Sequence, residues 1–124
     1  MVLLNDFFTL QSQEQVAGEY LFKILLNPEH VIFKAHFPGN PIVPGVCQIQ
    51  IAKELLEVIL KRPLCLVGAK NVKYMAVMTP QNLQSCYVCF SKIDSGSQDC
   101  KAVVKMYTSD KQYSKLSLVF NYPK

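Results

Sequence analysis

Residues 36–50 read HFPGNPIVPGVCQIQ, a proline- and glycine-rich loop that runs directly into an apolar segment. The prolines of this stretch each fix φ, and its glycines permit backbone conformations or close approaches that a side chain would prevent. Pro44 suits the first turn of a helix, because the N–H that proline lacks would have no intrahelical partner there. We therefore expect a stiff loop that holds His36 beside the free N–H groups of a helix start, which suit a developing oxyanion.

The segment after the loop has the spacing of a helix. Apolar residues recur at helical intervals over residues 44–60 and cover more than one stripe, as expected for a helix largely enclosed by protein. Segments of strand composition, separated by turn residues, flank it on both sides. The predicted extended segments are residues 7–13 and 20–26, joined through Ala17 and Gly18, a brief piece at 30–34, and then 64–78, 83–93, 100–108 and 113–122.

Residues 33–45, FKAHFPGNPIVPG, resemble the signature loop of the 3-hydroxyacyl-[acyl carrier protein] dehydratases of the hotdog superfamily nearly residue for residue. The resemblance implies an α+β hotdog fold, in which a curved antiparallel sheet wraps around one long central helix, with residues 1–124 as a single domain. It also implies a homodimer that covers an exposed sheet edge, with a higher oligomer or a heterodimer as further arrangements.

The activity that the resemblance implies is loss of water from a 3-hydroxyacyl thioester, carried on acyl carrier protein or coenzyme A, in fatty-acid or polyene-type biosynthesis. His36 would take the C2 proton, and the N–H of Gly45 would bind the thioester oxygen. Gln50 stands where the family keeps an Asp or Glu that acts across the dimer interface. No cofactor and no metal are implied. The substrate-binding residues implied are Phe37, Pro38, Gly39, Pro44, Val46, Tyr74 and Met75.

Gln50 leaves several functions open, because an amide is not an acid yet still donates and accepts hydrogen bonds. In an active dehydratase, His36 would carry the proton to the leaving hydroxyl and Gln50 would only orient the substrate. Alternatively, the chain is a non-catalytic acyl-thioester-binding subunit that pairs with an active partner. A hotdog thioesterase is a third reading, against which the HFPG loop argues. Glu54 is expected to face solvent beside a lysine, and His30 to be a surface residue.

The five cysteines are an odd set in apolar segments, which indicates reduced thiols in the core rather than a disulfide framework. Cys86 and Cys89 form a single CxxC without the second pair that a zinc site needs. Cys47 follows the helix start, where a thiol can become nucleophilic, but the prediction is a small buried hydrophobe.

Composition and charge exclude other classes of function. The net charge is +4, and Arg62 is the only arginine, so nucleic-acid binding is not expected. The first ten residues lack a basic region before an apolar run, which predicts neither a signal peptide nor a membrane span and indicates a cytoplasmic protein. Basic residues around the loop and helix would either attract an acidic carrier protein or form a solvated rim. They are Lys34, Lys53, Lys61, Arg62, Lys70 and Lys73.

Overall fold

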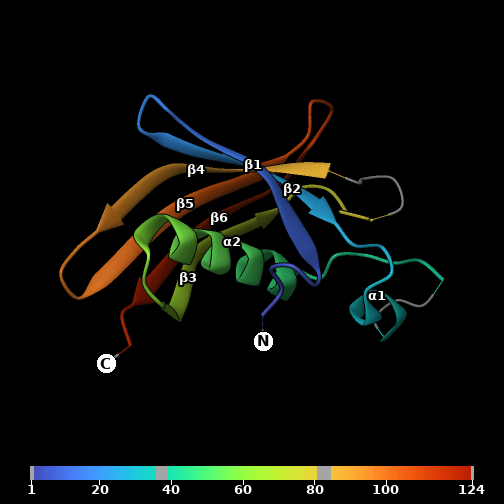
Figure 1. The fold of residues 1–124 in the computed structure, drawn as a ribbon, viewed down its shortest axis with the longest axis horizontal. Coiled ribbons are helices and arrows are strands. Elements are labelled where there is room, and N and C mark those ends of the chain that lie inside the picture. The colour runs from blue at the N-terminus through green and yellow to red at the C-terminus, as the bar shows by residue number, and fades with distance from the viewer. Residues whose placement is uncertain (1, 36–38, 81–84, 124) are drawn as a thin grey trace.

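The computed structural model describes residues 2–35, 39–80 and 85–123, and in them an antiparallel sheet packs on one long helix (Figure 1). In chain order the elements are β1 (Phe8–Val16), β2 (Glu19–Leu26), α1 (Val31–Ala35), α2 (Gly45–Leu60), β3 (Cys65–Tyr74), β4 (Ser85–Ser95), β5 (Asp99–Tyr107) and β6 (Gln112–Asn121).

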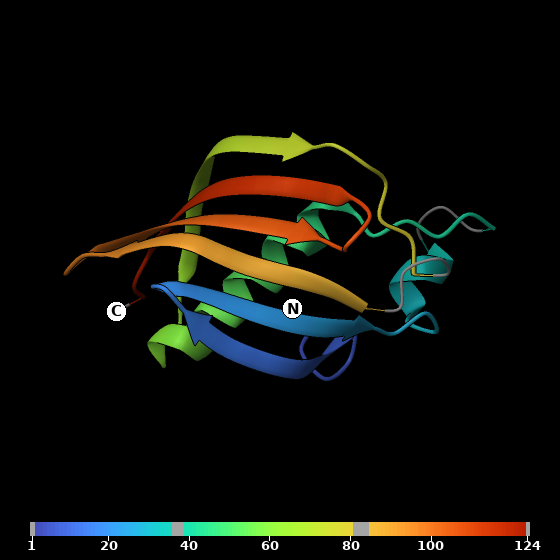
Figure 2. The same ribbon diagram turned by 90° about the horizontal axis from the view of Figure 1, so that it is seen from above.

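The strands lie in the order β1-β2-β4-β5-β6-β3, and each pair of neighbours is antiparallel. α2 runs across one face of the curved sheet, whereas α1 lies beyond one end of it (Figure 2). The edge strands are β1 and β3, so the strand that follows the central helix returns to the edge of the sheet. The predicted arrangement of a curved antiparallel sheet around one long helix is confirmed.

The core fills the space between α2 and the sheet. On α2, Ile51 and Leu55 are fully buried, and Val46 is the only residue of this helix classed as exposed. On β6, Leu116, Leu118 and Phe120 point inward and are buried, because successive side chains of a strand face opposite sides of the sheet. The helix is therefore largely enclosed by protein, as its composition predicts.

The outer face of the sheet carries a row of lysines. Lys115 on β6 pairs in register with Lys73 on β3 and with Lys105 on β5. None of these lysines forms an ion pair with another described residue. Like charges directly opposite one another across strands are destabilising, so this row costs the isolated chain some stability.

The prediction of an extended segment at residues 30–34 is wrong, because most of this segment belongs to the short helix α1. The turn before it is closed by backbone bonds from the N–H of His30 to the carbonyl of Asn27, and from the N–H of Phe33 to the carbonyl of His30. Side-chain hydrogen bonds of His30, described below, hold the start of this helix. A five-residue helix shows too little periodicity to be distinguished from an extended segment by sequence.

The strand predicted over residues 64–78 ends earlier, at Tyr74. Beyond it, the N–H of Met75 donates to the carbonyl of Tyr113 at 2.9 Å, and the N–H of Val43 donates to the carbonyl of Met78 at 2.7 Å. The second bond ties the loop before α2 to the segment after β3. Residues 83 and 84, at the start of the next predicted strand, lie outside the described residues.

Within the described parts of the chain, no helix combines the length and the apolar character that crossing a membrane requires.

The turn between β1 and β2 offers a test of the sheet's register. Ala17 and Gly18 both have positive φ, 51° and 81°, as a two-residue hairpin turn requires. Asn adopts this conformation more readily than Ala, so Ala17→Asn should raise the free energy of unfolding by up to about 1 kcal/mol in urea denaturation. Gly18→Ala should lower it. Equal stability of both variants would contradict this turn.

Candidate active site

The predicted catalytic loop is only partly described. His36, Phe37 and Pro38 lie outside the described residues. The structure does place both flanks of this loop, since α1 ends at Ala35 and Gly39 resumes the chain with φ of 81°, a value that favours glycine.

The start of α2 presents free backbone donors. Pro44 is its N-cap, with φ of −60° and ψ of 149°, and no side chain caps the helix. The carbonyl of Pro44 accepts from the N–H groups of Cys47 and Gln48 at 3.0 and 3.1 Å. The N–H groups of Gly45 and Val46 precede these bonds and have no place in the helical pattern, so they remain for a ligand oxygen.

Tyr74, at the end of β3, packs against the first residue of α2. A Cβ added to Gly45 would lie 2.5 Å from the Tyr74 hydroxyl oxygen and 2.7 Å from the ring carbon that bears it. Any side chain at position 45 would therefore displace the tyrosine. Partial burial raises the pKa of Tyr74, so its hydroxyl is a neutral donor at physiological pH. The structure thus brings together two residues that the sequence assigns to the substrate site.

A pocket of about 220 Å³ lies between the start of α2 and the segment that follows β3. Its walls are mostly apolar, and the polar groups beside it come from the helix start and from Tyr74. Residues that line it include Pro44, Gly45, Gln48, Tyr74, Val77 and Met78.

Val46 and Met75, two further predicted substrate residues, are exposed in the single chain. Val46 is 67% exposed and Met75 is 50% exposed. Gln50 lines a different, open hollow with Leu4 and Lys53. Within one chain, the structure therefore joins Pro44, Gly45 and Tyr74 but leaves Gln50 apart from their pocket.

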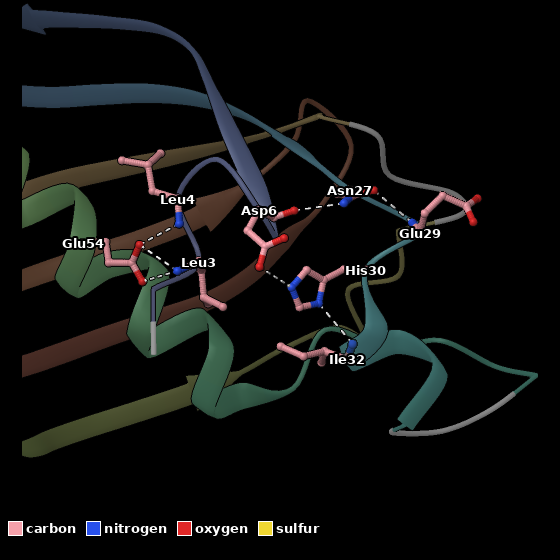
Figure 3. Close-up of polar contacts among 8 residues, drawn as sticks. All are labelled: Leu3, Leu4, Asp6, Asn27, Glu29, His30, Ile32 and Glu54. Atoms are coloured by element: carbon pink, nitrogen blue, oxygen red, sulfur yellow. Dashed lines mark hydrogen bonds and ion pairs between the residues drawn. The ribbon is translucent and has the colours of Figure 1, made fainter.

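Glu54 is buried, at 6% exposure, and the expectation of a solvent-facing glutamate beside a lysine is wrong. Its carboxylate accepts from the N–H of Leu3 at 3.0 and 2.8 Å and from the N–H of Leu4 at 2.7 Å (Figure 3). It also accepts from Nε2 of Gln50 at 2.8 Å. One carboxylate thus fastens the N-terminal segment to the central helix and orients the Gln50 amide.

His30 is also buried, at 9% exposure, so its assignment to the surface is wrong. Its Nδ1 accepts from the N–H of Ile32 at 3.1 Å, so the ring hydrogen is on Nε2, which donates to Asp6 at 3.0 Å (Figure 3). The ring packs edge-on against Phe7. His30 therefore holds the start of α1, the helix that leads into the HFPG loop.

Neither His30 nor Glu54 could be assigned from spacing alone, because most of their partners are backbone amides or residues far away in the sequence. The available signal for Glu54 was its position four residues after Gln50, on the same side of a helix whose surroundings are mostly protein.

Cys47, the thiol in the first turn of α2, is a buried thiol rather than a nucleophile. Cys47 is 3% exposed, and burial raises its pKa, so it stays protonated at neutral pH. Burial raises the pKa of Cys86 to about 12. Cys86 and Cys89 face opposite sides of β4, because they are three residues apart on a strand, and cannot hold one metal ion together. Cys65 is exposed, which corrects its assignment to the core.

Among residues 2–35, 39–80 and 85–123, no three His, Cys, Asp or Glu side chains gather as metal ligands would.

A curved antiparallel sheet around a central helix, with the helix start against the end of an edge strand, defines a hotdog-fold protein. A family model described as ApeI dehydratase matches residues 11–114. The chain belongs to this ApeI-like dehydratase family.

Two similar proteins of known name are also dehydratases. The chain is 31% identical over 90 residues to the 3-hydroxyacyl-[acyl-carrier-protein] dehydratase FabZ of Levilactobacillus brevis, covering 65% of this chain and 60% of that protein. It is 27% identical over 81 residues to the FabZ of Lactiplantibacillus plantarum, covering 58% and 55%. The match therefore spans little more than half the length of these relatives.

Solved structures share the fold. A chain of the dehydratase heterocomplex ApeI:P from Xenorhabdus doucetiae superposes with a TM-score of 0.71 at 20% identity, over 90% of this chain and 96% of that one. The protein smu.793 from Streptococcus mutans, solved bound to acetyl CoA, gives a TM-score of 0.64 at 9% identity, over 94% and 88%.

Removing the Glu54 carboxylate tests its role as a clamp. Glu54→Ala leaves two backbone N–H groups and the Gln50 amide without their acceptor, so the free energy of unfolding should fall by about 2 to 3 kcal/mol. The control is Lys53→Ala, at the position next to Glu54, which removes the half-buried ion pair between Lys53 and Glu57. It should lower the free energy of unfolding by less than about 1 kcal/mol. Urea denaturation measures both, and equal losses would contradict the clamp.

Proposed function

We propose that this chain is a homodimeric dehydratase that removes water from a 3-hydroxyacyl thioester, carried on acyl carrier protein or coenzyme A, in fatty-acid or polyene-type biosynthesis. The observation that carries the proposal is the start of α2, where free N–H groups and Tyr74 border an apolar pocket directly after the HFPG motif. The family membership supports the same chemistry.

In the proposed reaction, the N–H of Gly45 binds the thioester oxygen and stabilises the negative charge that grows on it. His36 takes the proton from C2, and the electron pair of that C–H bond forms the C2=C3 double bond. The C3–O bond breaks, and the proton on His36 passes to the departing oxygen, which leaves as water. The products are the 2-enoyl thioester and water, with His36 back in its starting state.

Gln50 acts in this scheme as a hydrogen-bonding group. Its Nε2 is engaged by Glu54, which fixes the plane of the amide. An amide oriented in this way would position the substrate hydroxyl without exchanging a proton. The proposal places Gln50 across a dimer interface from the partner's pocket, because within one chain Gln50 lies in a separate hollow.

The edge strand β3 supports the homodimer. It is bonded on one side to β6, and exposed apolar side chains lie on it and just beyond it. An exposed apolar sheet edge is usually covered, and pairing with a second copy would cover it. The exposed large apolar residues of this region are Leu66, Val67, Tyr74, Met75 and Val77. The five unpaired cysteines suit a reducing compartment such as the cytoplasm.

A second candidate function is a non-catalytic subunit that binds acyl thioesters and pairs with an active partner. The amide at position 50 favours it, since the family's acidic group is absent there. A relative that forms a heterocomplex, ApeI:P, supports the same reading.

One experiment separates these functions. Purified protein is incubated with 3-hydroxyacyl and 2-enoyl thioesters of acyl carrier protein, and loss or gain of water is followed by mass spectrometry. We expect interconversion, and its loss by a factor of at least about 100 in His36→Ala. Binding without a mass change would favour the non-catalytic subunit, and release of free acid would favour a thioesterase. A His36→Ala variant as fast as the parent would remove His36 from the mechanism.

Gln50→Glu tests the amide at position 50. The new carboxylate would lie within hydrogen-bond distance of Glu54, where two carboxylates share a proton rather than both ionising. A protonated acid would then be available to the leaving hydroxyl, so activity should be kept or raised, with a decline at high pH where that proton is lost.

The control for this variant is the exchange Gln50→Glu with Glu54→Gln, which restores one amide and one carboxylate in reversed order. It should be more stable to heat than Gln50→Glu alone while keeping its activity. Loss of activity in both variants would show that a carboxylate at position 50 does not serve the reaction.

A further inference from the structure

Gln48 has a buried side-chain amide without a partner for its oxygen. The residue is 3% exposed, and its Oε1 accepts no hydrogen bond from any described residue. An amide oxygen buried in this way costs about 1 to 3 kcal/mol. Buried polar groups in native proteins are nearly always satisfied by protein, water or a ligand, so this exception calls for a specific explanation.

The position of Gln48 suggests an explanation for its unpaired oxygen. It lies in the first turn of α2 and forms part of the wall of the apolar pocket that Gly45 and Tyr74 border. At about 220 Å³, this pocket is smaller than typical sites for drug-sized ligands, and its volume and mostly apolar lining suit a short acyl chain. A polar side chain in the wall of a mostly apolar pocket recognises a ligand that carries a matching polar group at a fixed depth.

The helix sets that depth. Residues three apart lie on nearly the same face of a helix and are separated by about 4.5 Å along its axis. If the thioester oxygen binds the N–H of Gly45, the acyl chain that continues into the pocket passes Gln48 a few ångströms further on. The substituent on C3, two carbons beyond the carbonyl, falls in this region.

We propose that Gln48 is the residue that reads the 3-hydroxyl group, by accepting its hydrogen bond through Oε1. This inference rests on the proposed function and names the group of the substrate that the same site selects. Donation of the hydroxyl hydrogen to Gln48 leaves the lone pairs of the hydroxyl oxygen for the proton that it must receive before it departs. A saturated acyl chain would leave Oε1 unpaired, and the site would reject it for that reason.

The test measures binding rather than turnover. In the His36→Ala background, which prevents reaction, calorimetry compares 3-hydroxyhexanoyl pantetheine with hexanoyl pantetheine. We expect the hydroxylated ligand to bind on the order of ten times more tightly. Adding Gln48→Met, which keeps the length of the side chain but removes the amide, should reduce this ratio to about two or less.

Ser114 offers a matched control, because its hydroxyl oxygen is the other buried side-chain atom without a partner in the described chain and it does not line the pocket. Ser114→Ala should leave the binding ratio unchanged. Gln48→Met should also raise the melting temperature of the unliganded protein, since it removes an unsatisfied amide.

A ligand comparison keeps the inference testable if Gln48→Met does not fold. A 3-fluoroacyl pantetheine has a similar size but no hydrogen to donate, so the His36→Ala protein should bind it no better than the saturated ligand. Equal binding of hydroxylated, fluorinated and saturated ligands would overturn the role of Gln48 and leave the proposed function standing. Failure of all three to bind would overturn the proposed function as well.

Discussion

The contact between Tyr74 and Gly45 is the constraint on which the candidate site depends. It joins the end of an edge strand to the first residue of the central helix, two points 29 positions apart in the chain. Because the phenol occupies the space of a side chain at position 45, the backbone N–H groups of the helix start and a tyrosine hydroxyl border the same pocket. The backbone bond from Val43 to Met78 holds the same two segments together one step further along.

The central helix carries two buried polar residues, Glu54 and Gln48, in a mostly apolar environment. They differ in whether their side-chain oxygens have hydrogen-bond partners. Glu54 has its carboxylate saturated by backbone amides and by Gln50, so it serves the architecture of the folded chain. Gln48 has its oxygen unsatisfied, so it lowers the stability of the unliganded protein. A fully paired buried group stabilises a single structure, whereas an unpaired buried group carries a desolvation cost that a hydrogen bond from a ligand would offset. The two residues lie six positions apart and have opposite physical roles.

Periodicity was sufficient to predict the long elements. The helix over residues 44–60 and the strand over residues 113–122 were predicted because a mostly enclosed helix and a half-buried strand leave strong patterns. Residues 30–34 were predicted as extended, since one helical turn leaves no pattern and depends on side-chain bonds of His30. The end of β3 at Tyr74 depends on backbone bonds to Tyr113, which no local rule contains.

The candidate site was also predicted only in part, because some of its residues leave a local pattern and others depend on long-range packing. The loop motif identified Pro44 and Gly45, because proline and glycine report directly on backbone conformation. Tyr74 was assigned from the family resemblance of its strand, and the structure brings it together with them. The environments of Glu54 and His30 were predicted wrongly, because burial of a polar side chain depends on what packs over it. For Glu54 that is the backbone of Leu3 and Leu4, 51 and 50 residues away.

The lysine row on the outer face of the sheet makes the stability of strand pairing depend on ionic strength. Lys73, Lys115 and Lys105 stand in register on adjacent strands, and their mutual repulsion opposes the pairing of β3, β6 and β5. Dissolved ions weaken such repulsion over roughly 8 Å at physiological salt. Dilute buffer should therefore weaken the pairing of the edge strand that bears Tyr74, and added salt should strengthen it.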